Sequence, residues 1–322
     1  MDKDIKVSVY CLAYNHGKYI RKTLEGFVNQ KTKFQYEVIV HDDASTDDTA
    51  DIIKEFSCQY PDIFVPIFQK KNQYSQNVRI LYEFIYPKMR GKYVAVCEGD
   101  DYWTDVEKLQ KQFNVMEKYE EVSICTHAVQ FISEEGKLID GRCPESGINI
   151  TEGLLKKDEF MRTVLMTGYP FHTSSFFFRK KILDAYMKDK PEFYSLFPTG
   201  DFAVLCYAAT FGGCYFINNV MSHYRVGAVG SWTERIKMDK SKICNRYERG
   251  INALKGLDEY TNYKYHDDIT YAVERDIITI NQVNRTYRNL LKYLGCIRGN
   301  SKIKYLILGI IDFIFPNCFV KL

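Results

Sequence analysis

The chain has 322 residues, of which 46% are hydrophobic and 26% are charged, so a disordered or low-complexity protein is excluded. The net charge is only +3 and the basic residues are dispersed, which does not support nucleic-acid binding. The ten cysteines include no Cys-x-x-Cys pair, so neither a zinc site nor a disulfide framework is indicated. The N-terminus carries no secretory signal, and we expect a cytoplasmic protein.

The first half of the chain alternates between apolar runs and amphipathic helical patterns. Predicted strands lie at 5–12, 37–41, 63–68 and 93–97, each followed by a predicted helix, at about 20–28, 48–58, 78–89 and 109–116. This alternation is typical of a parallel sheet covered by helices on both faces. Pro66 places the third strand near an edge of the sheet, because proline cannot donate a ladder hydrogen bond.

The second half is less regular. Predicted strands lie at 122–132, 174–179, 214–217 and 220–226, with a loop region at 133–150 and an apolar helix that opens at Gly200-Asp201. Beyond about residue 234 the strand signals fade, and residues 240–295 show helical spacing with heavy charge. We therefore predict one α/β domain over residues 1–235 and a C-terminal helical region over residues 236–322.

The end of the chain is unusually apolar. Residues 305–315 read YLILGIIDFIF, with Arg298, Lys302 and Lys304 before them and Lys321 after them. The run is too short to span a bilayer, which needs about 20 apolar residues. A basic lead into an apolar helix is typical of an element in the membrane interface. Residues 300–322 are expected either to bind the inner face of the cell membrane peripherally or to pack on the protein's own core.

The most informative motif is Glu98-Gly99-Asp100-Asp101-Tyr102-Trp103, directly after the buried run 93–97. In open α/β sheets, ligands bind in the crevice outside the carboxyl ends of the strands. Clustered carboxylates are costly there unless a cation shares the site. We predict Mn²⁺ or Mg²⁺ with a phosphorylated ligand, Asp101 as the direct metal ligand, Asp100 on a ribose or a metal-bound water, and Glu98 in support. The alternative is a solvated acidic turn before a helix.

Other candidates follow the same logic. Asp42-Asp43 comes after the second predicted strand and can accept from a uracil imide or a ribose hydroxyl, or simply form a turn. Ser45 or Thr46 is expected to cap the helix that follows.

Three residues in the second half are also candidates. Asp201 opens a buried helix, as either a general base or an N-cap. Arg225 can clamp phosphates with two parallel hydrogen bonds, and the neighbouring His223 can contact metal or phosphate. Gly227 and Gly230 suggest a loop that closes over substrate.

Together these motifs resemble a known family. The runs VSVYCLAYN (7–15), LEGFVNQ (24–30) and EVIVHDDASTD (37–47) are similar to the start of the family 2 inverting glycosyltransferases. The run at 98–103 looks like their Asp-x-Asp metal motif. The resemblance covers about the first 120 residues closely and extends more loosely to Trp232.

The resemblance implies a GT-A fold, which is a Rossmann-like and mostly parallel sheet flanked by helices. It also implies a divalent cation and a nucleoside-diphosphate sugar donor, most often linked to UDP. By position, Asp42 or Asp43 would read the base, Asp100 would meet the ribose and Asp101 the metal. Asp201 would be the general base. Tyr14, in the turn after the first strand, is counted with the donor-binding residues.

The chain departs from the family pattern at two places. Tyr224-Arg225 resembles the start of a Tyr-Arg-x-His element that contacts the diphosphate, but position 227 is glycine. Within the sequence, His223 is the substitute we consider. A second acid often precedes the base in this family, and here that position is Gly200.

The implied function is inverting, metal-dependent transfer of a sugar to a hydroxyl of a glycan or lipid-linked glycan, as in bacterial surface-polysaccharide assembly. One alternative is a non-catalytic nucleotide-sugar-binding subunit, supported by the two departures. The other is a sugar nucleotidyltransferase, which normally has a Gly-rich basic loop after the first strand. Tyr14-Asn15-His16-Gly17 does not supply such a loop.

Overall fold

The computed structural model describes residues 4–228, 239–284 and 301–314. The chain forms two compact units. The first, here called the sheet unit, comprises residues 1–161, 169–190 and 207–230, and the second, the helical unit, comprises residues 162–168, 191–206 and 231–322. The boundary predicted after residue 235 falls outside the described residues and stays a prediction.

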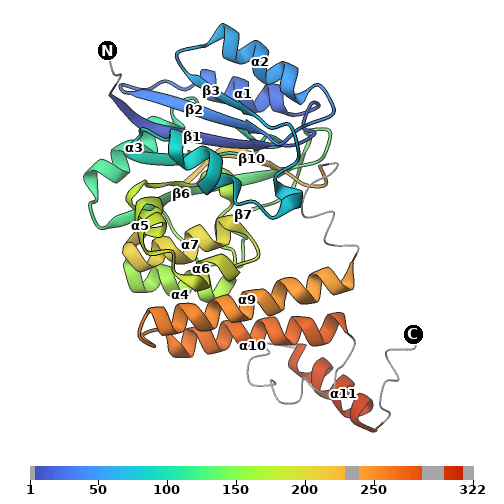
Figure 1. Cartoon of the computed structure of the whole chain (residues 1–322). Helices are drawn as coiled ribbons and strands as arrows, with labels where there is room; N and C mark the ends of the chain where they lie inside the picture. Colours follow the sequence, from blue (N-terminus) through green and yellow to red (C-terminus); the bar gives the residue numbers. More distant parts are fainter. Residues whose placement is uncertain (1–3, 229–238, 285–300, 315–322) are drawn as a thin grey trace. The chain divides into compact units, whose positions relative to one another are not determined.

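The sheet unit is built on one sheet that has ten strands within the described residues (Figure 1). Its order is β3 (Phe64–Phe68), β2 (Gln35–Asp42), β1 (Ile5–Ala13), β4 (Tyr93–Val96), β9 (Phe177–Arg179), β6 (Val122–Ile132), β10 (Gly213–Arg225) and β5 (Tyr102–Trp103). Two further strands, β7 (Leu138–Cys143) and β8 (Gly153–Leu155), pair with β6 and β10. The strands β3, β2, β1 and β4 are mutually parallel, so the predicted α/β class is confirmed.

The parallel strands are covered on both faces, which explains their nearly continuous apolar sequences. On one face, α1 (Ile20–Val28), α2 (Thr49–Gln59) and α3 (Lys108–Lys118) pack on alternating strand residues such as Val38 and Val40. On the other face, Phe84 stacks on His41 with ring centroids 5.6 Å apart. The rings of Tyr82 and Tyr186, from the same segment and from α5 (Lys181–Asp189), lie 4.3 Å apart. Pro66 lies in the edge strand β3, as predicted.

Three predicted elements differ from the structure. The helix expected at 78–89 is a π-helical turn, η2 (Leu81–Ile85), followed by the 3₁₀ turn η3 (Tyr86–Lys88), because Pro87 cannot donate an intrahelical hydrogen bond. The expected loop at 133–150 contains β7, whose exposed residues lack the apolar alternation that marks a strand. The two strands expected at 214–226 are one strand, β10, with a register shift between Ile217 and Val220.

Two predicted local details also change. The strand expected at 174–179 begins only at Phe177, because η4 (Thr173–Ser175) is a 3₁₀ turn. The start of α2 is held by Asp47, whose Oδ1 accepts from the backbone N–H of Thr49 (3.0 Å). The prediction that Ser45 or Thr46 caps this helix is therefore wrong. Those side chains are used elsewhere, and Ser45 Oγ accepts from the N–H of Asn15 (2.9 Å).

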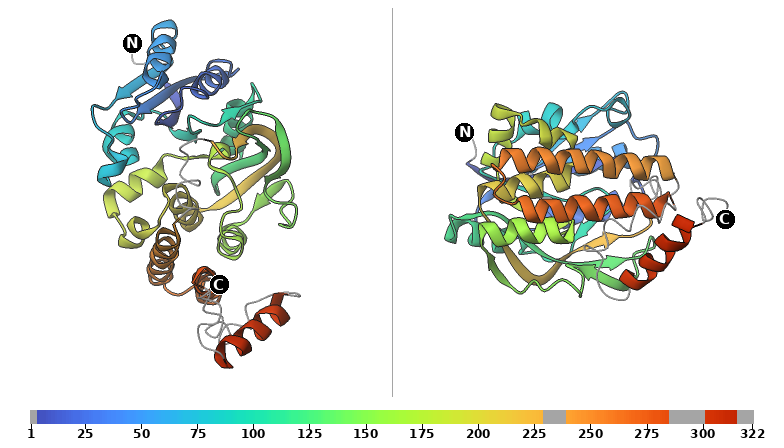
Figure 2. Two further views of the ribbon diagram at one scale, coloured as in Figure 1. Left: turned by 90° about the vertical axis from the view of Figure 1, so that its right-hand side faces the viewer. Right: turned by 90° about the horizontal axis from the view of Figure 1, so that it is seen from below.

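The helical unit contains α6 (Glu192–Leu196), α9 (Lys240–Tyr260), α10 (His266–Val283) and α11 (Ser301–Ile314). Two more helices, α4 (Lys157–Thr167) and α7 (Gly200–Phe211), have residues in both units. Helices α9 and α10 lie side by side (Figure 2), and Asp258 and His266 form an ion pair between them (2.6 Å). Both helices lie within the residues predicted to form a C-terminal helical region, and that domain assignment stays a prediction. None of the helices in the described ranges is long and apolar enough to cross a bilayer.

Lys108 is a fully buried basic residue. It follows the acidic turn, the name used here for residues 98–101 between β4 and β5. Its Nζ donates to Gln112 Oε1 (2.8 Å) and lies 4.0 Å from the centroid of the Trp103 ring. Burial lowers the pKa of this ammonium group from its ordinary 10.5 to about 7. The stability of the sheet unit must therefore depend on pH near neutrality.

We expect Lys108→Met to remove this pH dependence. The unfolded chain keeps the lysine proton to about pH 10, whereas the folded chain releases it near pH 7, so the unfolded state binds more protons between these values. The wild-type free energy of unfolding should rise by up to about 1.4 kcal/mol per pH unit above pH 7. Urea unfolding between about pH 6.5 and 8.5 measures the slope. Parallel profiles for the two proteins would contradict the prediction.

Candidate active site

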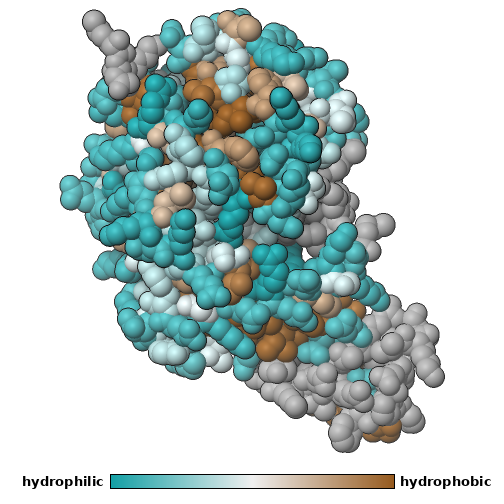
Figure 3. Space-filling view, in the orientation of Figure 1, coloured by the Kyte–Doolittle hydropathy of each residue, from teal (hydrophilic) through white to brown (hydrophobic). Residues whose placement is uncertain are grey.

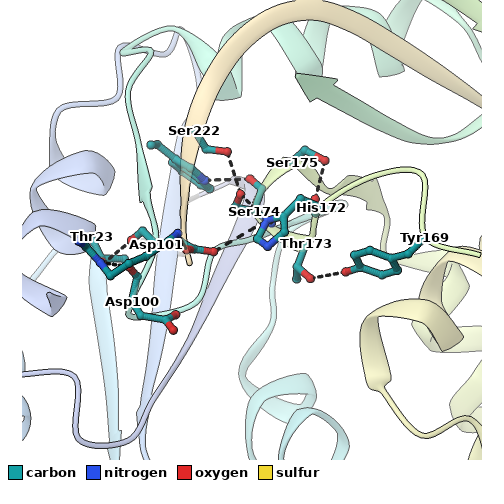
Figure 4. A network of polar contacts seen from close by, with 11 residues as sticks. Thr23, Asp100, Asp101, Tyr169, His172, Thr173, Ser174, Ser175 and Ser222 are labelled. Carbon is teal, nitrogen blue, oxygen red and sulfur yellow. Dashed lines mark hydrogen bonds and ion pairs between the residues drawn. The ribbon is translucent and has the colours of Figure 1, made fainter. Parts of the chain in front are cut away.

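The acidic turn connects β4 to β5 and is fixed from several sides (Figure 4). The hydroxyl of Thr23, from α1, donates to the carbonyls of Gly99 (3.1 Å) and Asp101 (2.6 Å). A Cβ at Gly99 would lie 2.7 Å from Nδ1 of His16, so a larger residue does not fit without movement. The turn therefore holds its two aspartates in a defined orientation.

Asp101 is nearly inaccessible to water, with 2% of its surface exposed. Its Oδ1 accepts from the backbone N–H of Arg225 (2.9 Å), and its Oδ2 lies 3.8 Å from Nδ1 of His172. Burial raises the pKa of this carboxyl group well above its ordinary value, and the charge of the neighbouring Asp100 raises it further. An ionised Asp101 is therefore unfavourable here until a cation binds beside it.

Tyr14, Asp42 and Asp43 lie at the same edge of the sheet as this turn. Ala13 and Asp42 are paired at the ends of β1 and β2, and β4 pairs in parallel with β1. Carboxyl ends of neighbouring parallel strands form the usual ligand crevice of such sheets. The structure thus brings together the residues predicted to bind the donor from the first half of the chain.

The two aspartates after β2 have different surroundings. Asp43 accepts from the backbone N–H groups of Gln73 (2.7 Å) and Tyr74 (3.0 Å), which fixes its carboxylate. Asp42 accepts from the N–H of Ser45 through Oδ2 (3.3 Å), whereas its buried Oδ1 has no hydrogen-bond partner among the residues that the structure describes. Each oxygen of Asp43 keeps a second lone pair, so both residues retain unused acceptor capacity.

Arg225 is buried and holds the end of β10 against the acidic turn. Its Nε donates to the carbonyl of Asp100 (3.0 Å), and one terminal nitrogen donates to the carbonyls of Ser133 (3.3 Å) and Glu134. Its guanidinium carbon lies 4.5 Å from the centroid of the Tyr19 ring. The role predicted for Arg225 at the diphosphate stays a prediction, and the contacts above give it a structural role as well.

The remaining predicted residues lie as follows. Asp201 belongs to the helical unit, where it is the second residue of α7 and its Oδ1 accepts from the N–H of Phe202 (2.7 Å). Its role as general base stays a prediction. His223 is hydrogen bonded through Nδ1 to the hydroxyl of Tyr102 (2.8 Å), and burial lowers the pKa of its ring. Gly230 and Trp232 lie outside the described residues.

Sequence reasoning missed His172. This residue precedes η4, and Oδ2 of Asp101 is 3.8 Å from its ring nitrogen (Figure 4). The one local signal is the polar run His172-Thr173-Ser174-Ser175 between apolar phenylalanines. Such a run is also typical of an ordinary turn.

The carboxylate and imidazole side chains near the acidic turn could supply only part of the coordination shell of a divalent cation. Within the residues that the structure describes, no three His, Cys, Asp or Glu side chains converge as a metal site. Mg²⁺ and similar ions, however, usually bind one or two protein carboxylates together with substrate phosphates and water. The buried and electrostatically unfavourable Asp101 fits such a site, which would be completed by a phosphorylated ligand.

Comparison with known proteins places the chain in a family. The model described as glycosyl transferase family 2 matches residues 8–187, which is more than half of the chain. The chain belongs to glycosyl transferase family 2.

Relatives of this family 2 member match it over part of their length. One is an Escherichia coli protein named UDP-Glc:alpha-D-GlcNAc-diphosphoundecaprenol beta-1,3-glucosyltransferase WfaP. It is 33% identical over 111 residues, which cover 34% of this chain and 41% of WfaP. An uncharacterized Mycobacterium tuberculosis protein is 43% identical over 130 residues, covering 40% of this chain and 37% of its own length. The chain thus spans about two fifths of these relatives.

Solved structures agree in fold. The Staphylococcus aureus TarS fragment in complex with UDP superposes with a TM-score of 0.54 at 16% identity, covering 96% of this chain and 92% of that one. The mannosyltransferase PcManGT from Pyrobaculum calidifontis, in complex with GDP-Man and Mn²⁺, gives 0.52 at 12% identity, covering 98% and 91%. At these identities the likeness concerns the fold, and the predicted GT-A fold is confirmed.

We expect Asp101→Asn to stabilise the metal-free protein. Because the folded-state pKa of Asp101 is raised, its contribution to stability is present at low pH and is lost as the carboxyl group ionises. Near pH 7.5 in EDTA, the neutral amide should therefore raise the free energy of unfolding by about 1–3 kcal/mol. Glu120→Gln, at an exposed position of the sheet unit outside this turn, is the control and should change little. A destabilised Asp101→Asn protein would contradict this electrostatic account.

Proposed function

We propose that this protein is an inverting, metal-dependent glycosyltransferase that moves a sugar from a UDP-linked donor to an acceptor hydroxyl. The observation that carries the proposal is the buried pair Asp100 and Asp101 at the carboxyl end of β4, beside the ends of β1 and β2. Family membership supports glycosyl transfer. The UDP complex of TarS and the name of WfaP support a UDP-linked donor.

The residues proposed to bind the UDP-sugar contact different parts of the nucleotide. Asp42 and Asp43 accept from the base, with Tyr14 beside them, and Asp100 accepts from the ribose. Asp101 holds Mn²⁺ or Mg²⁺, in keeping with the Mn²⁺ complex of PcManGT. When bound, this cation neutralises charge on the departing diphosphate. The peptide N–H of Arg225 fixes Oδ1 of Asp101 and leaves Oδ2 for the ion.

The reaction that we propose is a single in-line displacement. The acceptor oxygen forms a bond to the anomeric carbon while the bond from that carbon to the diphosphate oxygen breaks, so the configuration inverts. Asp201 takes the proton of the acceptor hydroxyl. This role rests on the resemblance and on the position of Asp201 in the first turn of α7. A positioned general base contributes about 10²–10⁴-fold to such reactions.

Asp201→Asn tests the base. We expect sugar transfer to fall by at least about 10²-fold, because the amide cannot accept the proton. The dissociation constant for the UDP-sugar, measured by calorimetry with Mn²⁺, should stay nearly unchanged. Asp267→Asn is a matched control, because Asp267 is also the second residue of a helix in the helical unit and is exposed. Equal loss of donor binding and transfer would mean that Asp201 has another role.

The acceptor that we propose is a lipid-linked glycan at a membrane surface. The name of WfaP describes an acceptor carried on diphosphoundecaprenol, which supports this class. Helix α11 supports it independently. Ile307, Ile310, Ile311 and Ile314 are 37–59% exposed and follow the spacing of one helix face. Its one acidic residue, Asp312, is buried.

In a helix that faces water, polar side chains are exposed and apolar ones are buried. In α11 the isoleucines are exposed and the aspartate is buried. In Figure 3, a small group of apolar atoms lies at the surface near the lower end of the segment that Figure 1 labels α11. The helix has 14 residues, or roughly 21 Å, which is shorter than the hydrocarbon core of a bilayer. We therefore propose that α11 lies in the membrane interface, with the basic residues of its sequence attracted to anionic lipid.

Vesicle flotation tests the membrane proposal. We expect the full chain to float with vesicles that contain phosphatidylglycerol. The triple variant Ile307→Ser, Ile310→Ser, Ile314→Ser should lose at least about tenfold in affinity, since each lost apolar contact weakens partition. The control replaces Leu138 and Val220 by serine, because they are exposed apolar residues of the sheet unit. Equal binding by both variants, or no binding by the wild type, would overturn the proposal.

A further inference from the structure

The acidic turn has different neighbours on its two sides. Strands β1 and β2 lie on one side of β4, and the residues that we assign to the nucleotide follow these two strands. On the other side lies β9, and the backbone N–H of Val96, at the end of β4, donates to the carbonyl of Phe176, directly before β9 (3.3 Å). An in-line displacement brings the acceptor to the anomeric carbon from the side opposite the diphosphate. We therefore expect the acceptor on the β9 side of the turn.

The segment that leads into β9 is held in place by three other elements (Figure 4). The indole N–H of Trp103, on β5, donates to the carbonyl of Ser174 (3.1 Å). The hydroxyl of Ser174 is hydrogen bonded to that of Ser222 on β10 (2.8 Å). The amide of Gln112, on α3, donates to the carbonyl of Ser175 (2.8 Å). Side chains on this segment are therefore carried by a fixed backbone.

Tyr169 belongs to this segment and has 36% of its surface exposed. Its hydroxyl is hydrogen bonded to Oγ1 of Thr173 in η4 (2.7 Å), which anchors the polar end of the side chain. Figure 4 shows His172 and Thr173 between Tyr169 and Asp101. Nδ1 of His172 lies 3.8 Å from Oδ2 of Asp101, so the segment approaches the acidic turn closely. Tyr169 is thus an anchored and exposed ring on the β9 side of the turn.

An exposed ring in this place has the chemistry of a platform for a sugar. A pyranose ring presents carbon-bound hydrogens on its faces and hydroxyl groups at its edge, so its faces can pack on an aromatic ring. Tyrosine offers a large and rigid contact area at low entropic cost, and an anchored ring has less freedom to lose on binding. In the described part of the sheet unit, the other exposed phenylalanine and tyrosine side chains are Phe68 and Tyr74, in β3 and in the loop after it.

We infer that Tyr169 is an acceptor-binding residue, whose ring packs against a sugar ring of the acceptor glycan on the side of the acidic turn opposite the nucleotide. The inference rests on the proposed function. The transferred sugar of the donor has the same chemistry, but it is bonded to the diphosphate and belongs next to Asp101. Tyr169 is separated from Asp101 by His172 and Thr173, which assigns its ring to the sugar beyond.

The test uses the full chain saturated with UDP and Mn²⁺, and measures sugar binding rather than turnover. Saturation-transfer NMR with irradiation of the aromatic protons detects methyl β-glycosides of glucose, galactose, mannose and N-acetylglucosamine that bind beside a ring. We expect at least one glycoside to bind the wild type through its carbon-bound protons, and Tyr169→Ala to weaken its affinity about three- to tenfold. Tyr169→Phe, which keeps the ring and loses the hydrogen bond to Thr173, should retain most of the affinity.

Tyr215→Ala is the matched control. Tyr215 lies near the start of β10, at the opposite end of this strand from Arg225, and its ring also contacts another ring, that of Tyr119, with centroids 5.3 Å apart. This variant should leave glycoside binding unchanged. Calorimetry with UDP and with UDP-glucose separates the donor sugar from the acceptor sugar. Both dissociation constants should be the same in Tyr169→Ala as in the wild type.

Unchanged glycoside affinity in Tyr169→Ala, or no binding of any of the four glycosides to the wild type, would overturn the inference. A Tyr169→Ala protein that loses affinity for UDP-glucose but not for UDP would assign the ring to the donor sugar and overturn the acceptor role. Equal loss of UDP binding and glycoside binding would mean that Tyr169 has a structural role only. A wild type that binds no UDP would instead overturn the proposed function.

Discussion

The site depends on two adjacent carboxylates, Asp100 and Asp101, that are held almost out of water at the end of β4. Hydrogen bonds orient Asp101 but do not neutralise it, and burial keeps its pKa high. The folded chain thus carries an electrostatic cost at neutral pH that a cation would remove. Stability lost at a functional site in this way is common in enzymes, where binding of the ligand restores it.

The rest of the sheet unit positions these carboxylates. Thr23 holds the carbonyls of the acidic turn from α1, and Trp103 connects the turn to η4. Lys108 lies under the Trp103 ring as a buried cation whose pKa is near neutrality. Arg225 ties the end of β10 to the same turn through backbone carbonyls. The acidic turn is therefore contacted by segments that are far apart in the sequence. These segments lie near residues 23, 174 and 225, and each contributes a group that fixes the geometry of the turn.

The local sequence pattern predicted features that depend on neighbouring residues, such as individual strands and the residues at their ends. The strands from β1 to β4 follow from apolar runs, and the aspartates at their ends follow from strand order, because parallel strands end at one edge. The approach of His172 to Asp101 could not be found in this way, since the two residues are 71 positions apart in the chain. The hydrogen bonds that the guanidinium of Arg225 donates to the carbonyls of Asp100 and Glu134 also join distant parts of the chain, so the sequence did not indicate them. Strand β7 was missed because its side chains are mostly exposed and leave no apolar pattern.

A crystal of the protein grown with UDP and Mn²⁺, with data collected at the manganese absorption edge, tests the central claim most directly. The account predicts an anomalous peak bonded to a carboxylate oxygen of Asp101 and to the diphosphate of UDP. A peak at another place, or UDP bound at this edge of the sheet with no metal beside Asp101, would contradict it.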